Sequence, residues 1–283
     1  MTSKTNDGPV WFVTGCSKGL GRAIAERVLR EGYRCVVTAR DVAQVDDLAR
    51  AHPGQALAIA QDVADPAANA AAVKRAEETF GRIDVLVNNA GYGYFAAIEE
   101  GEDEEVRRMF ETNFFGLVDM VRRVLPGMRS RRRGHIINIS SVAGLLSNPT
   151  SGYYSASKFA VNGMSEALEK EVAEHGIRVT LIEPGPTRTY FHGSSSRTTR
   201  TPNEAYAATA GARRKQMASN SGKQPGDPDR IAQIVVEVAT EANPPLHLVC
   251  GKQALERARE KMASLQKDLD TQESRSNSAD FAS

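Results

Sequence analysis

Short hydrophobic segments alternate with amphipathic segments along most of this sequence. The segments predicted to be strands are 10–14, 34–39, 55–63, 83–91, 134–141, 177–185 and 246–250. Helical periodicity is found between them, at 20–32, 42–51, 67–81, 103–128, 153–174 and 231–242. Strands buried on both faces are nearly continuous in apolar residues, and alternation with helices is typical of βαβ crossovers. The pattern predicts an α/β fold with a doubly wound parallel sheet covered by helices on both faces.

The alternation continues without a break, so we expect one domain over residues 8–252. Residues 187–226 fall outside the pattern and are rich in Ser, Thr, Gly, Arg and Asn. A loop of that length in a compact domain is commonly functional, and we interpret it as a lid over a substrate. Residues 253–283 should form a charged helix over 254–269, followed by a disordered tail.

Composition excludes several classes of function. A net charge of +1 gives no field that would attract nucleic acid or an anionic membrane. Cys16, Cys35 and Cys250 form no CxxC pair, so we expect neither disulfides nor a metal site. The polar start carries no apolar signal segment, and no apolar run is long enough to span a bilayer. We therefore expect a cytoplasmic protein.

The segment "TGCSKGLG" lies between the first predicted strand and the first helix. It places Gly15, Gly19 and Gly21 at a single strand–helix junction. Glycine allows the tight turn and the close approach of backbone to a phosphate, and the helix N-terminus then presents free N–H groups. A purely structural turn would not need three glycines, so we interpret this junction as a dinucleotide-binding site.

Four motifs occur together in a specific order: the glycine segment, "NNAG" at 88–91, "YSASK" at 154–158 and "PG" at 184–185. In combination they resemble the short-chain dehydrogenase/reductase family, and the resemblance covers roughly residues 10–251. It implies a Rossmann-like fold with a seven-stranded parallel sheet. It also implies an NAD(P)-dependent oxidoreductase that acts on a ketone or secondary alcohol.

The end of the second predicted strand bears on which cofactor is bound. NAD enzymes place an acidic residue there for the ribose 2′-hydroxyl, whereas a cation suits the 2′-phosphate of NADP. In the register of the family, Ala39 stands at the acidic position and Arg40 follows it. Lys18 is a second cation, and Asp41 fits as the N-cap of the next helix. We therefore expect NADP rather than NAD.

Two adjacent tyrosines precede Lys158, and only one is correctly spaced. Tyr154 and Lys158 are four residues apart and share a helix face, whereas Tyr153 lies off that face. A free phenol has a pKa of about 10, which a nearby ammonium should lower toward working pH. Tyr154 and Lys158 could also be an exposed structural pair on a helix. Because the dinucleotide-binding glycine junction occurs in the same sequence, we consider that the weaker interpretation. We predict that Tyr154 is the general acid/base and that Lys158 lowers its pKa.

The resemblance implies further site residues. Ser141, thirteen residues before the tyrosine, would contact the substrate oxygen in preference to Ser140, and Asn113 would hold a water of the proton relay. Lys158 would also hold the nicotinamide ribose. The expected cofactor contacts are Gly15, Ser17, Lys18, Gly19, Leu20, Gly21, Arg40, Asp62, Val63, Asn89, Ala90, Gly91, Tyr154, Lys158, Pro184, Gly185, Thr187 and Thr189.

Aromatic and aliphatic residues near these motifs are candidates for a substrate wall or for ordinary packing: Tyr92, Tyr94, Phe95, Leu145, Leu146, Tyr190 and Phe191. They favour an apolar small-molecule ketone or alcohol. A noncatalytic NADP sensor, or an epimerase or dehydratase of the nucleotide-sugar branch, is the alternative function. The family also implies a homodimer or homotetramer.

Overall fold

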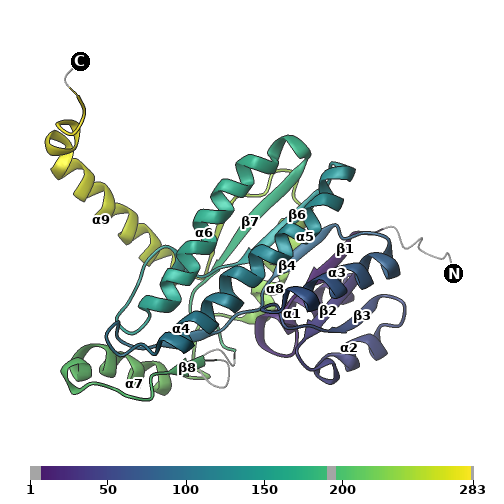
Figure 1. The fold of residues 1–283 in the computed structure, drawn as a ribbon, viewed down its shortest axis with the longest axis horizontal. Helices are drawn as coiled ribbons and strands as arrows, with labels where there is room; N and C mark the ends of the chain where they lie inside the picture. The colour runs from purple at the N-terminus through teal and green to yellow at the C-terminus, as the bar shows by residue number, and fades with distance from the viewer. Residues whose placement is uncertain (1–7, 190–195, 282–283) are drawn as a thin grey trace.

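A parallel β-sheet forms the centre of the molecule. The computed structural model describes residues 8–189 and 196–281. The main sheet has the strand order β3-β2-β1-β4-β6-β7-β9 (Figure 1). Its strands are β1 (Val10–Val13), β2 (Arg34–Ala39), β3 (Ala56–Ala60), β4 (Val85–Asn88), β6 (Gly134–Ile139), β7 (Ile177–Pro184) and β9 (His247–Cys250). Every neighbouring pair is parallel, which confirms the predicted seven-stranded α/β sheet.

Helices cover both faces of this sheet because the strands send alternate side chains to opposite faces. Trp11 and Val13 belong to one hydrophobic cluster, and Phe12 belongs to the other. The first face is covered by α1 (Gly19–Arg30), α2 (Asp46–Ala51) and α8 (Pro228–Thr240). The second is covered by α3 (Pro66–Phe80), α5 (Gly116–Arg131) and α6 (Gly152–Val172).

The strand order reverses at β1, which lies between β2 and β4. Val13, the last residue of β1, pairs with Val37 on one side and Val87 on the other. Open α/β sheets bind ligands outside the carboxyl ends of the strands at such a reversal. The loops that follow β1 and β4 therefore mark the expected position of the site.

Two predicted helices are interrupted. The stretch 103–128 contains α4 (Asp103–Phe110), the π-helical turn η2 (Glu111–Phe115) and then α5. A π turn inserts one residue without disturbing the hydrophobic periodicity strongly, so the sequence pattern does not reveal it. The stretch 42–51 is a 3₁₀ turn, Val42–Gln44, followed by α2. Asp41 caps that turn as expected, with its carboxylate accepting from the N–H of Ala43 at 3.1 Å.

The segment predicted as a lid contains structure that the sequence pattern did not indicate. Strand β8 (Ser196–Thr198) pairs in parallel with β5 (Gly93–Phe95), which follows the fourth strand of the main sheet. Short helical turns at 204–211 lead into α7 (Ala212–Ser219). Tyr190 and Phe191 lie outside the described residues.

The last helix, α9 (Lys252–Asn277), projects away from the domain (Figure 1). The predicted disordered tail from Asp270 onward is wrong as far as Asn277, since the helix continues to that residue. Its sequence is rich in Ala, Leu, Glu, Lys, Gln and Arg, the residues with the highest helix propensity. Ala254 and Ala258 anchor its first turns in the domain. Among the helices of residues 8–189 and 196–281, none has the length and apolar content needed to cross a bilayer.

Candidate active site

The glycine junction after β1 has the close packing that the sequence predicts. Gly15 and Gly19 adopt positive φ angles of 72° and 65°. A Cβ on Gly21 would lie 2.2 Å from Nδ2 of Asn89 and 2.4 Å from the carbonyl oxygen of Gly15. No larger side chain fits there without moving the backbone. The turn is therefore held tightly, with the N-terminus of α1 directed at the ends of β1 and β4.

Asn89 and Thr14 join the two central strands at this point. The side-chain amide of Asn89 donates to the carbonyls of Thr14 at 2.9 Å and Gly15 at 3.1 Å. The Thr14 hydroxyl accepts from the backbone N–H groups of Asn89 and Ala90, at 2.9 and 3.0 Å. The "NNAG" loop is thus fixed against the glycine turn, which explains how both can form one wall.

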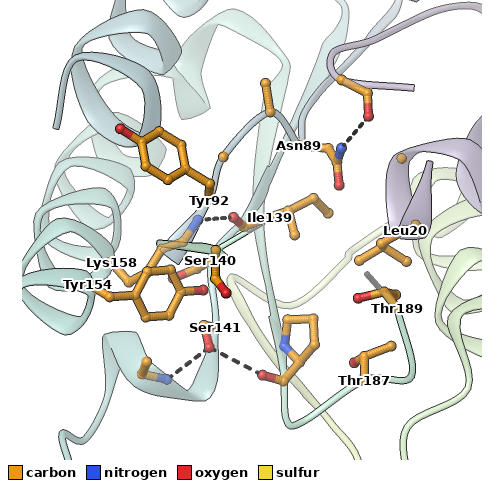
Figure 2. A pocket seen from close by; sticks show the side chains of 18 of the residues that line it. Leu20, Asn89, Tyr92, Ile139, Ser140, Ser141, Tyr154, Lys158, Thr187 and Thr189 are labelled. Carbon is orange, nitrogen blue, oxygen red and sulfur yellow. Dashed lines mark hydrogen bonds between the residues drawn. The ribbon is translucent and has the colours of Figure 1, made fainter. Parts of the chain in front are cut away.

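A cavity of about 470 Å³ opens at this edge of the sheet. Of the site residues predicted from the sequence, every one except Asn113 lines it. The glycine turn, Arg40 and Asp62 line one part of it, and Ser141, Tyr154 and Lys158 line another. In Figure 2 the side chains of Tyr154 and Ser141 lie together, with Leu20, Thr187 and Thr189 across the view. The fold therefore brings the predicted cofactor and catalytic residues to one cavity.

The Ser141 hydroxyl lies beside the Tyr154 phenol and favours its ionised form. Ser141 is the second residue after β6, and its hydroxyl accepts from the N–H of Ala143 at 3.1 Å and donates to the Pro184 carbonyl at 3.4 Å (Figure 2). Ser140 is buried, and its hydroxyl donates to Oδ1 of Asn162 at 2.6 Å. Ser141 is thus the serine that the structure brings against the tyrosine.

Lys158 lies beside this pair, with its Nζ donating to the carbonyl of Ile139 at 2.8 Å and lying 5.9 Å from the centre of the Tyr154 ring. Burial lowers the pKa of Lys158 to about 8. Burial also raises the pKa of Tyr154 to about 12, and the Ser141 hydroxyl only partly opposes that rise. The direction of this shift is opposite to the expected one, because desolvation of the phenolate outweighs the contribution of Ser141, and a lowering of the tyrosine pKa by Lys158 stays a prediction.

Tyr153 points away from the cavity. Its hydroxyl donates to the carbonyl of Ile98 at 2.6 Å, and its ring lies 6.2 Å from that of Tyr94. A Cβ on Gly101 would lie 2.3 Å from the Tyr153 ring, so this ring is packed closely against backbone. The two neighbouring tyrosines consequently have separate environments, as their spacing from Lys158 predicts.

Asn113 lies in the π-helical turn η2 and is buried next to the cavity wall. Its amide oxygen accepts from the N–H of Tyr92 at 3.0 Å, and its Nδ2 donates to the Tyr92 carbonyl at 2.9 Å and to the Ser157 hydroxyl at 3.2 Å. Both N–H groups of the amide are thus used by protein partners. The side chain fixes the loop after β4 against α6, and the predicted contact with a relay water stays a prediction.

Several cavity residues were missed from the sequence. Tyr92 and Phe95 line the cavity as the wall interpretation suggests, whereas Leu146 packs with Val142 and Ala254. Tyr94 is buried and its hydroxyl contacts Glu102. The missed lining residues include Asn148, Ser151, Arg197, Arg213, Met217, Asn220, Gln224 and Arg257. Most of these come from the lid segment and α9. The sequence pattern did not indicate them because they do not follow a predicted strand.

The structural geometry agrees with comparisons to known proteins. The family model described as short chain dehydrogenase matches residues 9–200. An oxidoreductase of Botryotinia fuckeliana, BOA17, is 40% identical over 88% of this chain and 91% of its own length. The crystal structure of a short-chain dehydrogenase from Streptomyces avermitilis superposes with a TM-score of 0.90 at 37% identity, covering 96% of this chain and 100% of that one. This chain belongs to the short chain dehydrogenase family.

Solved neighbours carry both nicotinamide cofactors. A metagenomic short-chain oxidoreductase in complex with NADP has a TM-score of 0.68 and 31% identity, covering 86% of this chain and 96% of that one. A Burkholderia phymatum member in complex with NAD has a TM-score of 0.80 and 27% identity, covering 93% and 97%. The protein is therefore an oxidoreductase of a family that binds NAD or NADP and acts on small molecules.

Proposed function

We propose that this protein transfers a hydride between NADP(H) and a ketone or secondary alcohol, with Tyr154 as the general acid/base. The observation that carries the proposal is that Tyr154, Ser141 and Lys158 line the same cavity as the glycine turn. The residues present fit a dinucleotide because the cavity extends from the tight turn below α1 to these hydroxyls without leaving the carboxyl edge of the sheet.

The preference for NADP rests on two cations. Lys18 and Arg40 are exposed and line the cavity, where a 2′-phosphate would find positive charge. Asp41, the nearest carboxylate in sequence, is engaged in capping the turn at Val42–Gln44. Asp62 accepts from the N–H of Ala64 at 3.0 Å. Position 39, where NAD enzymes carry an acidic residue for the ribose 2′-hydroxyl, is an alanine in this chain.

A bound nicotinamide would supply or accept the hydride at the carbonyl carbon. A pKa of about 12 keeps Tyr154 protonated at neutral pH, which suits a proton donor to the developing alkoxide during reduction. Ser141 would donate a second hydrogen bond to the substrate oxygen and stabilise its charge. In the oxidative direction the phenolate is needed, and a protonated Lys158 would favour it.

The test is NADPH and NADH oxidation by the purified protein against a panel of ketones, with alcohols and the oxidised cofactors for the reverse reaction. We expect turnover with NADPH and an apolar ketone. Cofactor binding without turnover of any carbonyl or alcohol would contradict the proposal and favour the noncatalytic sensor.

We also propose that the protein forms dimers or tetramers through η2 and α6. Phe115 and Phe159 are 52% and 45% exposed on these two elements, which contact each other. Exposed aromatic side chains are enriched in interfaces between subunits. Sedimentation of Phe115→Ser and Phe159→Ser variants should show dissociation to the monomer, and unchanged assembly would contradict the proposal.

A further inference from the structure

Two arginines of the cavity are neighbours without an acidic partner. Arg213 lies on α7 and Arg257 on α9, and both line the cavity. Arg213 donates from Nη1 to the amide oxygen of Gln216 at 2.6 Å, and its Nε is buried without a partner. Arg257 donates from Nη2 to Oδ1 of Asn148 at 2.7 Å. Within residues 8–189 and 196–281, neither guanidinium forms an ion pair. The side-chain partner of each is a neutral amide.

Other arginines in this part of the molecule are paired differently. Arg197, also on the cavity wall, forms an ion pair with Glu105 at 2.6 Å. Arg214, next to Arg213, forms an ion pair with the fully buried carboxylate of Glu100. Burial and the charge of Arg257 lower the pKa of Arg213, as expected for two cations held close together. Unlike Arg197 and Arg214, Arg213 and Arg257 have no carboxylate partner among the described residues.

Gln224 provides an independent sign of a ligand. Its side chain is 97% buried, since only 3% of the residue surface is exposed, and it lines the cavity. Both Nε2 and Oε1 are without a hydrogen-bond partner among the described residues. The backbone carbonyl accepts from Nε of Arg188 at 3.1 Å, which holds the residue in place. Buried amide groups are normally satisfied, and this one faces the cavity with a donor to offer.

The position of Arg213 relative to Tyr154 follows from its place on α7. Met217 follows Arg213 by one helical turn, so the two residues share a face of α7, and both line the cavity. Met217 packs against the apolar cluster that contains Tyr154 and Phe95. The face of α7 that carries Arg213 is therefore turned toward the reactive hydroxyl across an apolar surface. Among the described lining residues the only carboxylate is Asp62, which follows β3 beside the glycine turn.

We propose that Arg213, Arg257 and Gln224 bind an anionic group of the substrate, a carboxylate or a phosphate, at a distance from the carbonyl that Tyr154 protonates. Paired guanidinium groups and an amide N–H are the donors that such anions prefer. The substrate is then a ketone, or the matching alcohol, with an apolar segment between its carbonyl and its anionic end. This inference rests on the proposed function for the identity of the reacting group.

The experiment compares charged and neutral forms of the same substrates. A chain-length series of methyl ketones that end in a carboxylate is assayed beside the corresponding methyl esters, and beside methyl ketones that end in a phosphate. We expect the acid or the phosphate of the best chain length to have a KM lower than the ester by about tenfold or more. The phosphate arm shows which anion the site takes.

Variants assign the effect to the two arginines. Arg213→Gln and Arg257→Gln should each raise KM for the anionic ketone by about tenfold, with little change for the ester. Lys215→Gln and Arg259→Gln, exposed positions on α7 and α9, are the matched controls and should change neither. Equal KM values for acid, phosphate and ester in the unmodified protein would overturn the inference.

Calorimetric titration separates this inference from the proposed function. The protein is titrated, in the presence of NADP⁺, with the keto acid of the best chain length and separately with its methyl ester. This measures binding without turnover, because NADP⁺ cannot reduce the ketone. Tighter binding of the acid that is lost in Arg213→Gln supports the anion site even if no ketone is reduced. Turnover of the neutral ketones with equal binding of acid and ester would retain the proposed function and refute the anion site.

Discussion

Tyr153 and Tyr154 are adjacent in sequence, yet their hydroxyls have opposite environments. The Tyr153 hydroxyl donates to the Ile98 carbonyl outside the cavity, whereas Tyr154 lines the cavity together with Ser141. The difference follows from helix geometry, because only Tyr154 shares a face of α6 with Lys158.

This relationship predicts different results for one substitution at the two positions. Tyr154→Phe should abolish turnover, because the proton donor is removed, while the affinity for NADPH is retained. Tyr153→Phe should keep most of the activity. Steady-state rates and NADPH fluorescence titration of both variants test this, and equal loss of activity in the two would contradict the assignment.

The two cations at the end of β2 and in the glycine turn predict cofactor selectivity. The unmodified protein should show a lower KM for NADPH than for NADH, and Arg40→Ala should raise KM for NADPH by about tenfold, because a charge-assisted contact with the 2′-phosphate is lost. KM for NADH should change little. Arg50→Ala, exposed on α2, serves as the control. A preference of the unmodified protein for NADH would refute the prediction.

Burial of Lys158 predicts a dependence of stability on pH. Its pKa falls to about 8 in the folded chain, so above that pH the folded chain loses a proton that the unfolded chain still holds. The free energy of unfolding contributed by this group therefore rises between about pH 8 and about pH 10.5. Urea unfolding of the unmodified protein and of Lys158→Met at about pH 7 and about pH 10 measures it. The difference between the two proteins should shift in favour of the unmodified one at the higher pH. A constant difference would show that Lys158 is not buried with a lowered pKa.

The ion pair of Arg214 with Glu100 predicts how α7 is held. Arg214 lowers the pKa of Glu100 to about 2, so the stabilising contribution is present above about pH 4.5 and is lost as the pH falls toward 2. Arg214→Met leaves the buried carboxylate of Glu100 without its cation and with only the N–H groups of Ala97 and Asn203, which costs about 3–5 kcal/mol. Hydrogen exchange should become faster across 204–219, and Lys215→Met should leave it unchanged. Exchange that is unaltered in Arg214→Met would contradict an anchoring role.

The sequence predicted the parts of the site that lie at strand ends. Gly21, Ser141 and Tyr154 each follow a buried hydrophobic segment or belong to a helix with clear periodicity, so the parallel sheet alone brings them together. Arg213 and Arg257 could not be predicted in this way. They belong to a lid segment and a terminal helix whose positions are set by tertiary contacts, such as the pair of Arg214 with Glu100 for the lid segment.

The direction of the pKa shift at Tyr154 also could not be predicted. Spacing shows that an ammonium lies one turn away, but it does not show how much water remains around the phenol. The structure shows Tyr154 as 8% exposed, and desolvation decides the sign. The π-helical turn at Asn113 escaped the sequence pattern for a related reason, since one inserted residue changes hydrogen bonding more than hydrophobic spacing.

The position of Arg257 on the projecting helix α9 has a practical consequence for protein engineering. A helix that is anchored by two alanines and is otherwise solvated can be exchanged between relatives without rebuilding the sheet. Because that helix contributes Arg257 to the cavity in its second turn, we expect such chimeras to transfer part of the substrate preference while leaving Tyr154 on α6 and Ser141 after β6 untouched.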